Sequence, residues 1–274
     1  MRRENPFCHH GYSESTTRSV RTQGIVVPKG AHEPQSLQVE VYGGPDHVLL
    51  KPLLNGLCGS DVQKLRNGSY AYAPYADGII LGHEVLAQTL EPHSVNGQRV
   101  SAGTLVVPII TRRVCGARGD TLAAPELPRC PCHPYITPGS SRWDGFASVV
   151  AYEHPDYLIA ASDELYPYLV LSEPLAIVWK GLRRLLAASP PSAHPTAAVI
   201  GLGPIGLLAA GVLADQGWEI VGIDRVLPHH VRARLFGDFV GEKKAYLQFP
   251  EHRGRLGMFD VVVEAAGSRD SLEH

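Results

Sequence analysis

Four residues in three separate segments have side chains that can bind a metal ion. Cys58 supplies a thiol in a predicted tight turn, His83 and Glu84 place an imidazole beside a carboxylate, and Glu173 adds a carboxylate at the start of a predicted helix. Zinc accepts thiolate, imidazole and carboxylate ligands, and a catalytic zinc has three protein ligands and one open position. Each segment alone also has a structural explanation, because a buried cysteine commonly packs as a small hydrophobic residue. Together, the four residues indicate zinc binding.

A second chemical signal is a glycine-rich turn between a predicted strand and a predicted helix. Residues Ala197 to Ile200 suit a buried strand, Gly201 to Gly206 follow the pattern G-x-G-x-x-G, and Leu207 to Ala214 continue as a helix. Such a turn binds a dinucleotide pyrophosphate, because its backbone can approach the phosphates at the positive end of the helix. The candidate cofactor-binding residues in the turn are Gly201, Gly203, Pro204, Ile205 and Gly206.

Asp224 follows the next apolar segment, Glu219 to Ile223, and is expected to face the ribose of a bound nucleotide. A carboxylate at this position accepts both ribose hydroxyls and repels a 2′-phosphate, so the sequence favours NAD over NADP. The neighbouring Arg225 partly offsets that repulsion and is also a candidate cofactor-binding residue.

The glycine-rich run is apolar enough to suggest a membrane span as an alternative. Three glycines and a proline near its start argue against a span, as does its charged strand and helix context. We therefore expect no membrane partner.

The composition is that of an ordinary globular protein. The chain has 274 residues, of which 44% are hydrophobic and 19% charged, so it is long enough for two domains. A net charge of −2 indicates no polyanionic partner such as a nucleic acid. Residues 1–22 are expected to form a flexible leader without the apolar core of a secretory signal, which favours a cytoplasmic location. Five cysteines, an odd number, favour reduced thiols or metal ligands over a disulfide framework.

The spacing of apolar residues predicts two architectures along the chain. Between Gly24 and Val107, short apolar groups alternate with turn residues, as is typical of a β-rich domain. Residues Arg112 to Arg142 lack periodicity and are expected to form a loop. Helices and strands then alternate. The expected elements are a helix at Glu173 to Leu186, strands at Ala197 to Ile200 and Glu219 to Ile223, a helix at Pro228 to Phe236, a short strand at Phe239 and Val240, and a strand at Asp260 to Ala265.

By this count the nucleotide-binding sheet has four strands, whereas a doubly wound domain normally has about six. Residues Ser268 to His274 resemble the first turn of a helix that does not continue. The sequence is therefore expected to be C-terminally truncated, with one edge of the sheet exposed.

Taken in order along the chain, these segments resemble a zinc-dependent medium-chain dehydrogenase of the polyol and glucose dehydrogenase type. The resemblance runs from about Gly24 to the C-terminus, and the order of the segments makes it specific. The matching segments are Cys58 to Asp61, Gly82 to Glu84, Trp143 to Phe146, Glu173 to Leu175, Gly201 to Gly206 and Val261 to Gly267.

The resemblance implies an α/β protein with two domains. A GroES-like β-barrel catalytic domain would occupy residues 23–175, and a partial Rossmann NAD-binding domain would occupy residues 176–274. The implied reaction is hydride transfer between the CH–OH group of a polyol, sugar or cyclitol and NAD(P), with Zn²⁺ and NAD as cofactors. A homo-oligomer is implied for the full-length protein.

Carried over residue by residue, the resemblance makes Cys58 and His83 zinc ligands. Glu84 and Glu173 are then the acidic candidates for the remaining coordination, either directly or through water. Asp61 would accept the other N–H of His83, an arrangement common around protein-bound zinc. Ser60 would be the first group of a proton relay from the substrate hydroxyl.

The family's second, structural zinc is not expected. Four potential donors lie in the corresponding region, but their spacing differs from the usual four-cysteine lobe. They are Cys115, Cys130, Cys132 and His133.

Two other classes of protein also fit the sequence. A truncated relative could bind nucleotide or zinc without turnover, and the short C-terminal region supports that alternative. A zinc-free reductase of the same superfamily is the other, although such reductases generally lack the Cys58, His83 and Glu173 set.

Overall fold

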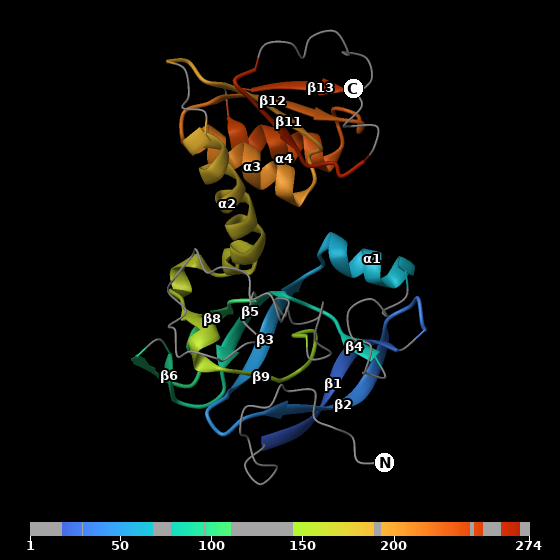
Figure 1. Ribbon diagram of the computed structural model, residues 1–274, viewed down its shortest axis with the longest axis vertical. Coiled ribbons are helices and arrows are strands. Elements are labelled where there is room, and N and C mark those ends of the chain that lie inside the picture. Colours follow the sequence, from blue (N-terminus) through green and yellow to red (C-terminus); the bar gives the residue numbers. More distant parts are fainter. Residues whose placement is uncertain are drawn as a thin grey trace. The chain divides into compact units, whose positions relative to one another are not determined.

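The computed structural model describes residues 18–28, 30–67, 78–95, 97–110, 145–188, 193–241, 244–248 and 259–268. The chain divides into two compact units, unit 1 at Met1–Glu173 and unit 2 at Pro174–His274. Figure 1 shows that the described part of unit 1 consists mainly of strands, whereas unit 2 combines helices with a small sheet.

Unit 1 is built from antiparallel sheets. One sheet has the order β2-β1-β4, a second has the order β10-β8-β5-β3-β9, and β6 pairs with β7. The strands are β1 Arg18–Pro28, β2 Gln35–Gly43, β3 Val48–Gly56, β4 Gly78–Ile80, β5 Glu84–Thr89, β6 His93–Val95, β7 Gln98–Val100, β8 Leu105–Pro108, β9 Ala151–Glu153 and β10 Leu158–Ala160. The helices are α1 Gly59–Asn67 and three 3-10 helices, Pro155–Tyr157, Asp163–Leu165 and Tyr168–Leu171.

The core of the larger sheet explains why its central strands form. Inward-facing side chains of β3, β5, β8 and β10 pack into one apolar cluster that includes Leu50, Val85, Val106 and Leu158. Leu50, Val106 and Leu158 are fully buried, so the free energy of apolar burial stabilises these strands. The pairing of β3 with β5 has an irregular register between Pro52 and Leu54.

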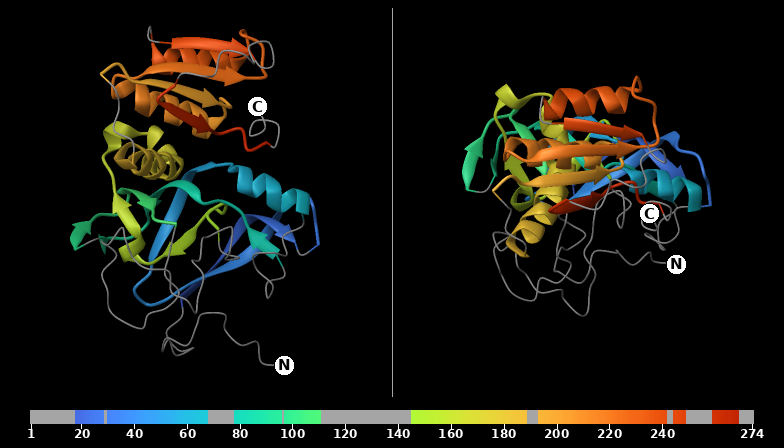
Figure 2. Two further views of the ribbon diagram at one scale, coloured as in Figure 1. Left: turned by 45° about the horizontal axis from the view of Figure 1, so that its top comes forward. Right: turned by 90° about the horizontal axis from the view of Figure 1, so that it is seen from above.

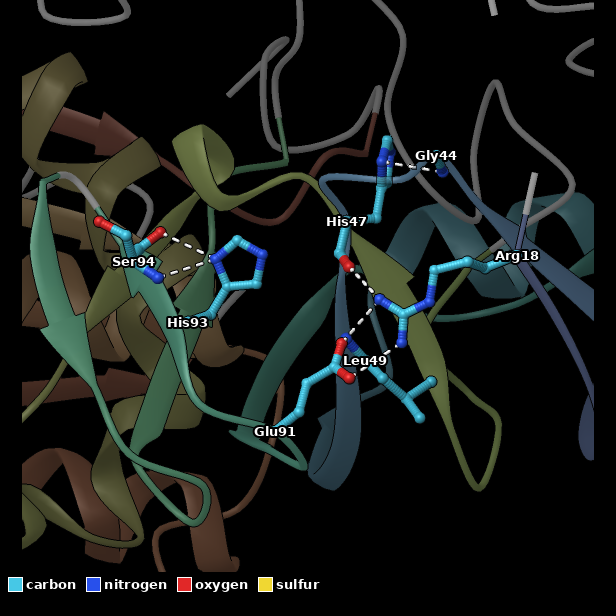
Figure 3. Close-up of polar contacts among 7 residues, drawn as sticks. All are labelled: Arg18, Gly44, His47, Leu49, Glu91, His93 and Ser94. Carbon is cyan, nitrogen blue, oxygen red and sulfur yellow. Dashed lines mark hydrogen bonds and ion pairs between the residues drawn. The ribbon is translucent and has the colours of Figure 1, made fainter. Parts of the chain in front are cut away.

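An arginine clamp joins the first strand of unit 1 to the larger sheet (Figure 3). Arg18 donates from Nη1 and Nη2 to the two carboxylate oxygens of Glu91, both at 2.9 Å. Arg18 Nη1 also donates to the carbonyl of His47 at 3.0 Å, and the backbone N–H of Leu49 donates to Glu91 at 3.2 Å. The guanidinium lies 5.2 Å from the ring centre of Tyr152, within range of a cation–π interaction. The clamp therefore ties residues far apart in the sequence.

Unit 2 has a four-stranded parallel sheet with the order β13-β12-β11-β14. Figure 2 shows the four strands side by side. The strands are β11 Thr196–Ile200, β12 Glu219–Asp224, β13 Lys244–Gln248 and β14 Val261–Glu264, and the helices are α2 Ser172–Ala188, α3 Pro204–Asp215 and α4 Val231–Val240. Three consecutive β11 residues, Ala197 to Val199, are fully buried. Since neighbouring strand residues point to opposite faces, both faces of the sheet are covered at β11.

Some predicted elements differ from the observed ones. Phe239 and Val240, predicted as a strand, are the last residues of α4, and the third strand of the sheet comes later at Lys244–Gln248. That prediction was wrong because α4 buries Phe236 and Val240 on one face, so the apolar pair continues a helical spacing. Arg18 to Thr22, which were predicted to be part of a flexible leader, belong to β1.

The membrane-span alternative receives no support from the described helices. None of them is both long and apolar enough to cross a bilayer. The glycine-rich run is divided between β11 and α3.

Candidate metal centre and nucleotide turn

Cys58 lies between the end of β3 and the start of α1. Its carbonyl accepts hydrogen bonds from the N–H groups of Asp61 at 3.0 Å and Val62 at 3.3 Å, which closes the first turn of the helix. Its own N–H donates to Asp61 Oδ2 at 3.1 Å. The predicted tight turn is therefore the beginning of a helix, and a carboxylate of that helix caps it.

His83 and Glu84 reach the same place through the pairing of β3 with β5. Gly56 lies opposite Glu84 in this ladder, and a Cβ at Gly56 would collide with the Glu84 side chain. Gly82, directly before His83, has a φ of 95°, a conformation that favours glycine. The carbonyl of Gly82 also accepts a hydrogen bond from the N–H of Phe146 at 3.0 Å. Phe146 thus supports the turn from which the imidazole projects.

The three side chains converge. One ligand atom each of Cys58, His83 and Glu84 lies within 4.8 Å of the others, a spacing that suits donors around one metal ion. His83 is 5% exposed, and its Nδ1 has no hydrogen-bond partner in the described part of the chain. A thiol, an imidazole and a carboxylate together suit zinc.

Burial is the main influence on the pKa values of these donors. Burial raises the pKa of the Cys58 thiol, although a hydrogen bond to Ser60 lowers it in part. Burial also raises the pKa of Glu84 and lowers the pKa of His83. A divalent cation favours thiolate, carboxylate and neutral imidazole, so metal binding at this place would release protons.

Glu173, at the start of α2, lies outside the group of three donors. Its pKa is raised to about 7, chiefly by burial and also by the charge of Glu84. The influence of Glu84 on this pKa indicates that the two carboxylates are near each other. Coordination by Glu173, either directly or through water, stays a prediction.

Ser60 and Asp61 lie beside His83. Ser60 Oγ is 3.4 Å from His83 Nε2, a long hydrogen bond that brings the hydroxyl next to the imidazole. Asp61 Oδ1 is 3.7 Å from His83 Nδ1, which is near but beyond hydrogen-bond range. The sequence analysis did not anticipate Lys64, whose ammonium donates to the same Asp61 oxygen at 2.7 Å.

The glycine-rich turn has the geometry that its sequence predicts. Gly201 has a φ of 89°, and a Cβ there would lie 2.6 Å from the backbone nitrogen of Ala266. A Cβ at Gly206 would collide with the Gly201 carbonyl. Both glycines are therefore required by close backbone packing.

The middle of the turn is open. A Cβ at Gly203 would meet no atom within 4 Å in the described structure. Gly203 is the N-cap of α3, Pro204 occupies the first turn, and Ile205 is 39% exposed. Packing of the described residues thus gives no reason for a glycine at 203, whereas the close approach of a phosphate does.

Asp224 ends β12 and is bound to the turn. Its Oδ2 accepts the N–H of Leu202 at 2.7 Å, and its side chain is only 9% exposed. Arg225 is exposed, and Nη1 of Arg232 on α4 lies 3.9 Å from Asp224 Oδ2. The carboxylate therefore lies at the carboxyl end of a parallel strand, where doubly wound sheets bind their ligands, with arginines nearby.

Several predicted features fall outside the described residues. They are the region Arg112 to Arg142, the potential donors Cys115, Cys130, Cys132 and His133, and Trp143 and Asp144 of the matching segments. Of the described cysteines, Cys58 is free.

Residues 44–155 match the family model of the alcohol dehydrogenase GroES-like domain. Over 248 residues the chain is 36% identical to the glucose 1-dehydrogenase of Thermoproteus tenax, a match that covers 86% of this chain and 66% of that protein. The match to the family model places residues 44–155 in the alcohol dehydrogenase GroES-like domain family. The chain spans just under two thirds of the length of the Thermoproteus tenax relative.

Solved structures of medium-chain dehydrogenases share the fold. The glucose dehydrogenase of Haloferax mediterranei in complex with NADP, Zn and gluconolactone has a TM-score of 0.73 at 19% identity, covering 90% of this chain and 71% of that chain. The L-idonate 5-dehydrogenase of Escherichia coli has a TM-score of 0.71 at 18% identity, covering 94% and 73%. The predicted fold class, a GroES-like domain with a Rossmann-type α/β unit, is confirmed.

Proposed function

We propose that the protein is a zinc-dependent oxidoreductase that transfers hydride between the CH–OH group of a sugar, polyol or cyclitol and NAD(P). The observation that carries the proposal is the convergence of Cys58, His83 and Glu84 in a chain that also has a dinucleotide-binding turn. The glucose 1-dehydrogenase of Thermoproteus tenax at 36% identity supports a sugar as the substrate class.

In this proposal Cys58 and His83 hold the zinc, with Glu84 or Glu173 completing the protein ligands. A bound zinc supplies Lewis-acid polarisation, which lowers the pKa of a substrate hydroxyl toward neutrality. The Ser60 hydroxyl, 3.4 Å from His83 Nε2, is then the chain's first acceptor for the hydroxyl proton. Asp61 keeps the Cys58 loop in place through its bond to the Cys58 N–H.

The nucleotide is bound by unit 2. The open N-cap at Gly203 leaves room for a pyrophosphate, which the N–H groups of the first turn of α3 would bind. Asp224 would face the adenosine ribose and favour NAD over NADP. The Haloferax mediterranei glucose dehydrogenase was solved with NADP, and Arg225 and Arg232 are placed to attract a 2′-phosphate. Tighter binding of NADPH than of NADH would therefore overturn the NAD preference.

The domain limits, location and assembly follow from the same proposal. The catalytic domain is assigned to residues 23–175 and the nucleotide-binding domain to residues 176–274, and the two compact units support a division at Glu173. A cytoplasmic homo-oligomer is proposed from the family resemblance, and the net charge of −2 supports the absence of a nucleic-acid partner. Light scattering coupled to size exclusion measures the assembly.

The first test is zinc per chain by elemental analysis, with NADH fluorescence enhancement on the same sample. About one zinc per chain and bound NADH support the proposal. Cys58→Ser is expected to lose the zinc and to keep NADH binding, whereas the control Cys8→Ser is expected to keep both. If wild type holds no zinc and binds no NADH, the chain is a relative that has kept the fold without the chemistry.

If both cofactors bind, a screen of sugars and polyols follows. NADH formation at 340 nm is measured with wild type and Cys58→Ser. Activity that disappears with the thiol supports zinc chemistry. Activity that survives in Cys58→Ser supports the zinc-free reductase alternative.

A further inference from the structure

Lys64 is a charged side chain in an unusual place. It is 1% exposed and is among the largest fully buried side chains of the described structure. Lysine is almost never fully buried unless it is paired, because removing an ammonium group from water is costly. Its position on the second turn of α1 therefore needs a reason beyond the stability of that short helix.

The ammonium of Lys64 holds a carboxylate that connects two of the proposed metal ligands. Lys64 Nζ donates to Asp61 Oδ1 at 2.7 Å, and both side chains are 1% exposed. The other oxygen, Oδ2, accepts the N–H of Cys58 at 3.1 Å, while Oδ1 also lies 3.7 Å from His83 Nδ1. A single buried carboxylate thus lies between the Cys58 loop and the His83 ring, and Lys64 holds its orientation.

Structural stability alone is a weak explanation for this pair. The desolvation of two buried charges often exceeds their attraction, so a buried ion pair commonly contributes little net stability. In addition, His83 Nδ1 is buried without a hydrogen-bond partner in the described residues, and the nearby carboxylate oxygen is the one that Lys64 holds. Both observations favour a role in arranging the donors.

We propose that Lys64 is a positioning residue of the metal centre and acts through Asp61. This inference rests on the proposed zinc-dependent function. The ammonium keeps Oδ1 turned toward the His83 ring, where it would accept the ring N–H of an imidazole that holds a metal. Partners of this kind fix the orientation of histidine ligands and raise metal affinity.

Removing the ammonium has two opposite effects on zinc affinity. The pair changes from neutral to negative, which by itself attracts a divalent cation. The carboxylate also loses the donor that orients it, which weakens the hold on Cys58 and His83. Asp61 accepts the Cys58 N–H through one oxygen and lies beside the His83 ring with the other, so a loss of its orientation acts on both ligands and is expected to dominate.

The test measures zinc affinity by competition with a chromogenic chelator in the full chain. Lys64→Met is expected to bind zinc about 10- to 100-fold more weakly than wild type, the usual cost of losing a group that orients a ligand. The control Arg66→Met removes a positive charge from an exposed position on the same helix and is expected to leave the affinity unchanged. The visible spectrum of the Co²⁺-loaded protein is expected to change in Lys64→Met alone, which a purely structural role would not produce.

A double variant keeps the inference testable if Lys64→Met does not fold. Asp61→Asn/Lys64→Met removes both charges of the buried pair together, so neither is left without the other. If Lys64 acts through Asp61, this variant binds zinc no more weakly than Asp61→Asn. Further weakening of about tenfold over Asp61→Asn would mean an independent action and would overturn the inference.

The remaining outcomes separate this inference from the proposed function. Folded Lys64→Met with the zinc affinity and Co²⁺ spectrum of wild type, or with a higher affinity, overturns the positioning role and leaves the zinc centre intact. If wild type binds no zinc that depends on Cys58, the metal centre itself fails, and the role of Lys64 fails with it.

Discussion

The nucleotide turn and the metal centre obtain their geometry in opposite ways. The turn is made by six consecutive residues, Gly201 to Gly206, and each required glycine contacts backbone within the same unit. The metal centre combines Cys58 with His83 and Glu84 through the pairing of β3 with β5. A local motif therefore determines the first site, and long-range strand pairing determines the second.

The comparison predicts that the turn tolerates substitution only at its open position. Gly206→Ala is expected to destabilise unit 2 by about 3 kcal/mol or more, because its Cβ collides with the Gly201 carbonyl. Gly203→Ala is expected to change stability by about 1 kcal/mol or less and to weaken NADH binding. Urea unfolding and NADH titration measure the two effects. Equal losses of stability would contradict the division of roles among the glycines.

Glu84 and Glu173 are expected to contribute unequally to zinc affinity. Glu84→Gln is expected to lower zinc affinity about 10- to 100-fold, because Glu84 belongs to the converging group. Glu173→Gln is expected to have a smaller effect, since Glu173 lies outside that group. Chelator competition measures both, and Glu164→Gln, exposed in a 3-10 helix, is the control. A larger loss from Glu173→Gln would reverse the assignment of the third ligand.

Asp224 is expected to set the preference of the nucleotide turn for NADH over NADPH. Asp224→Asn removes the charge that repels a 2′-phosphate and keeps an oxygen for the Leu202 N–H. The ratio of NADPH to NADH affinity is therefore expected to rise about tenfold, roughly 1.4 kcal/mol. Fluorescence titration with both nucleotides gives the ratio, and Asp215→Asn at the end of α3 is the exposed control. An unchanged ratio would remove the basis for the NAD preference.

Loss of the arginine clamp is expected to change the free energy of unfolding least, and this change is expected to depend on pH. Arg18 holds the pKa of Glu91 below its ordinary value of 4.5, chiefly by hydrogen bonding. The stability gained from this ionised carboxylate is present above pH 4.5 and is lost as the pH falls through the lowered pKa. Because both side chains are about one third exposed, Arg18→Met is expected to cost only about 0.5–1 kcal/mol at pH 7.

Urea midpoints at several pH values measure the effect of the clamp. The difference between Arg18→Met and wild type is expected to shrink as the pH falls below 4.5. Arg21→Met, an exposed position on the same strand, serves as the control. A difference that stays constant with pH would assign the clamp to the contact with Tyr152 and the bond to the His47 carbonyl.

The sequence predicted the fold and most of the turn because their signals are local. An apolar strand, three spaced glycines and a following helix lie within one short stretch, and β11 and α3 form there. The boundary errors also have local causes, since Phe239 and Val240 have strand-forming side chains but end α4, which buries Val240 and leaves Phe239 half exposed. Apolar pairs of this kind do not distinguish the two structures.

The arrangement of the metal centre could be predicted only in part. Residue types pointed to Cys58 and His83, but helix α1 was missed because Gly59 to Asn67 has few apolar residues. One of the residues that α1 buries is Lys64, and a lysine is normally read as a solvent-facing position. Its contact with Asp61 is an i,i+3 pair within α1, so it could be predicted only if the helix itself had been predicted.

The ladder between β3 and β5 has a consequence for how such a protein can change during evolution. Backbone hydrogen bonds, with Gly56 opposite Glu84, hold the two sides of the metal centre together. Side chains around the site can therefore be replaced without separating the donors. An insertion or deletion within β3 between the irregular register at Pro52 and Cys58 would shift one donor against the other two. Side chains around the site are accordingly free to vary, whereas the length of this short strand segment is constrained.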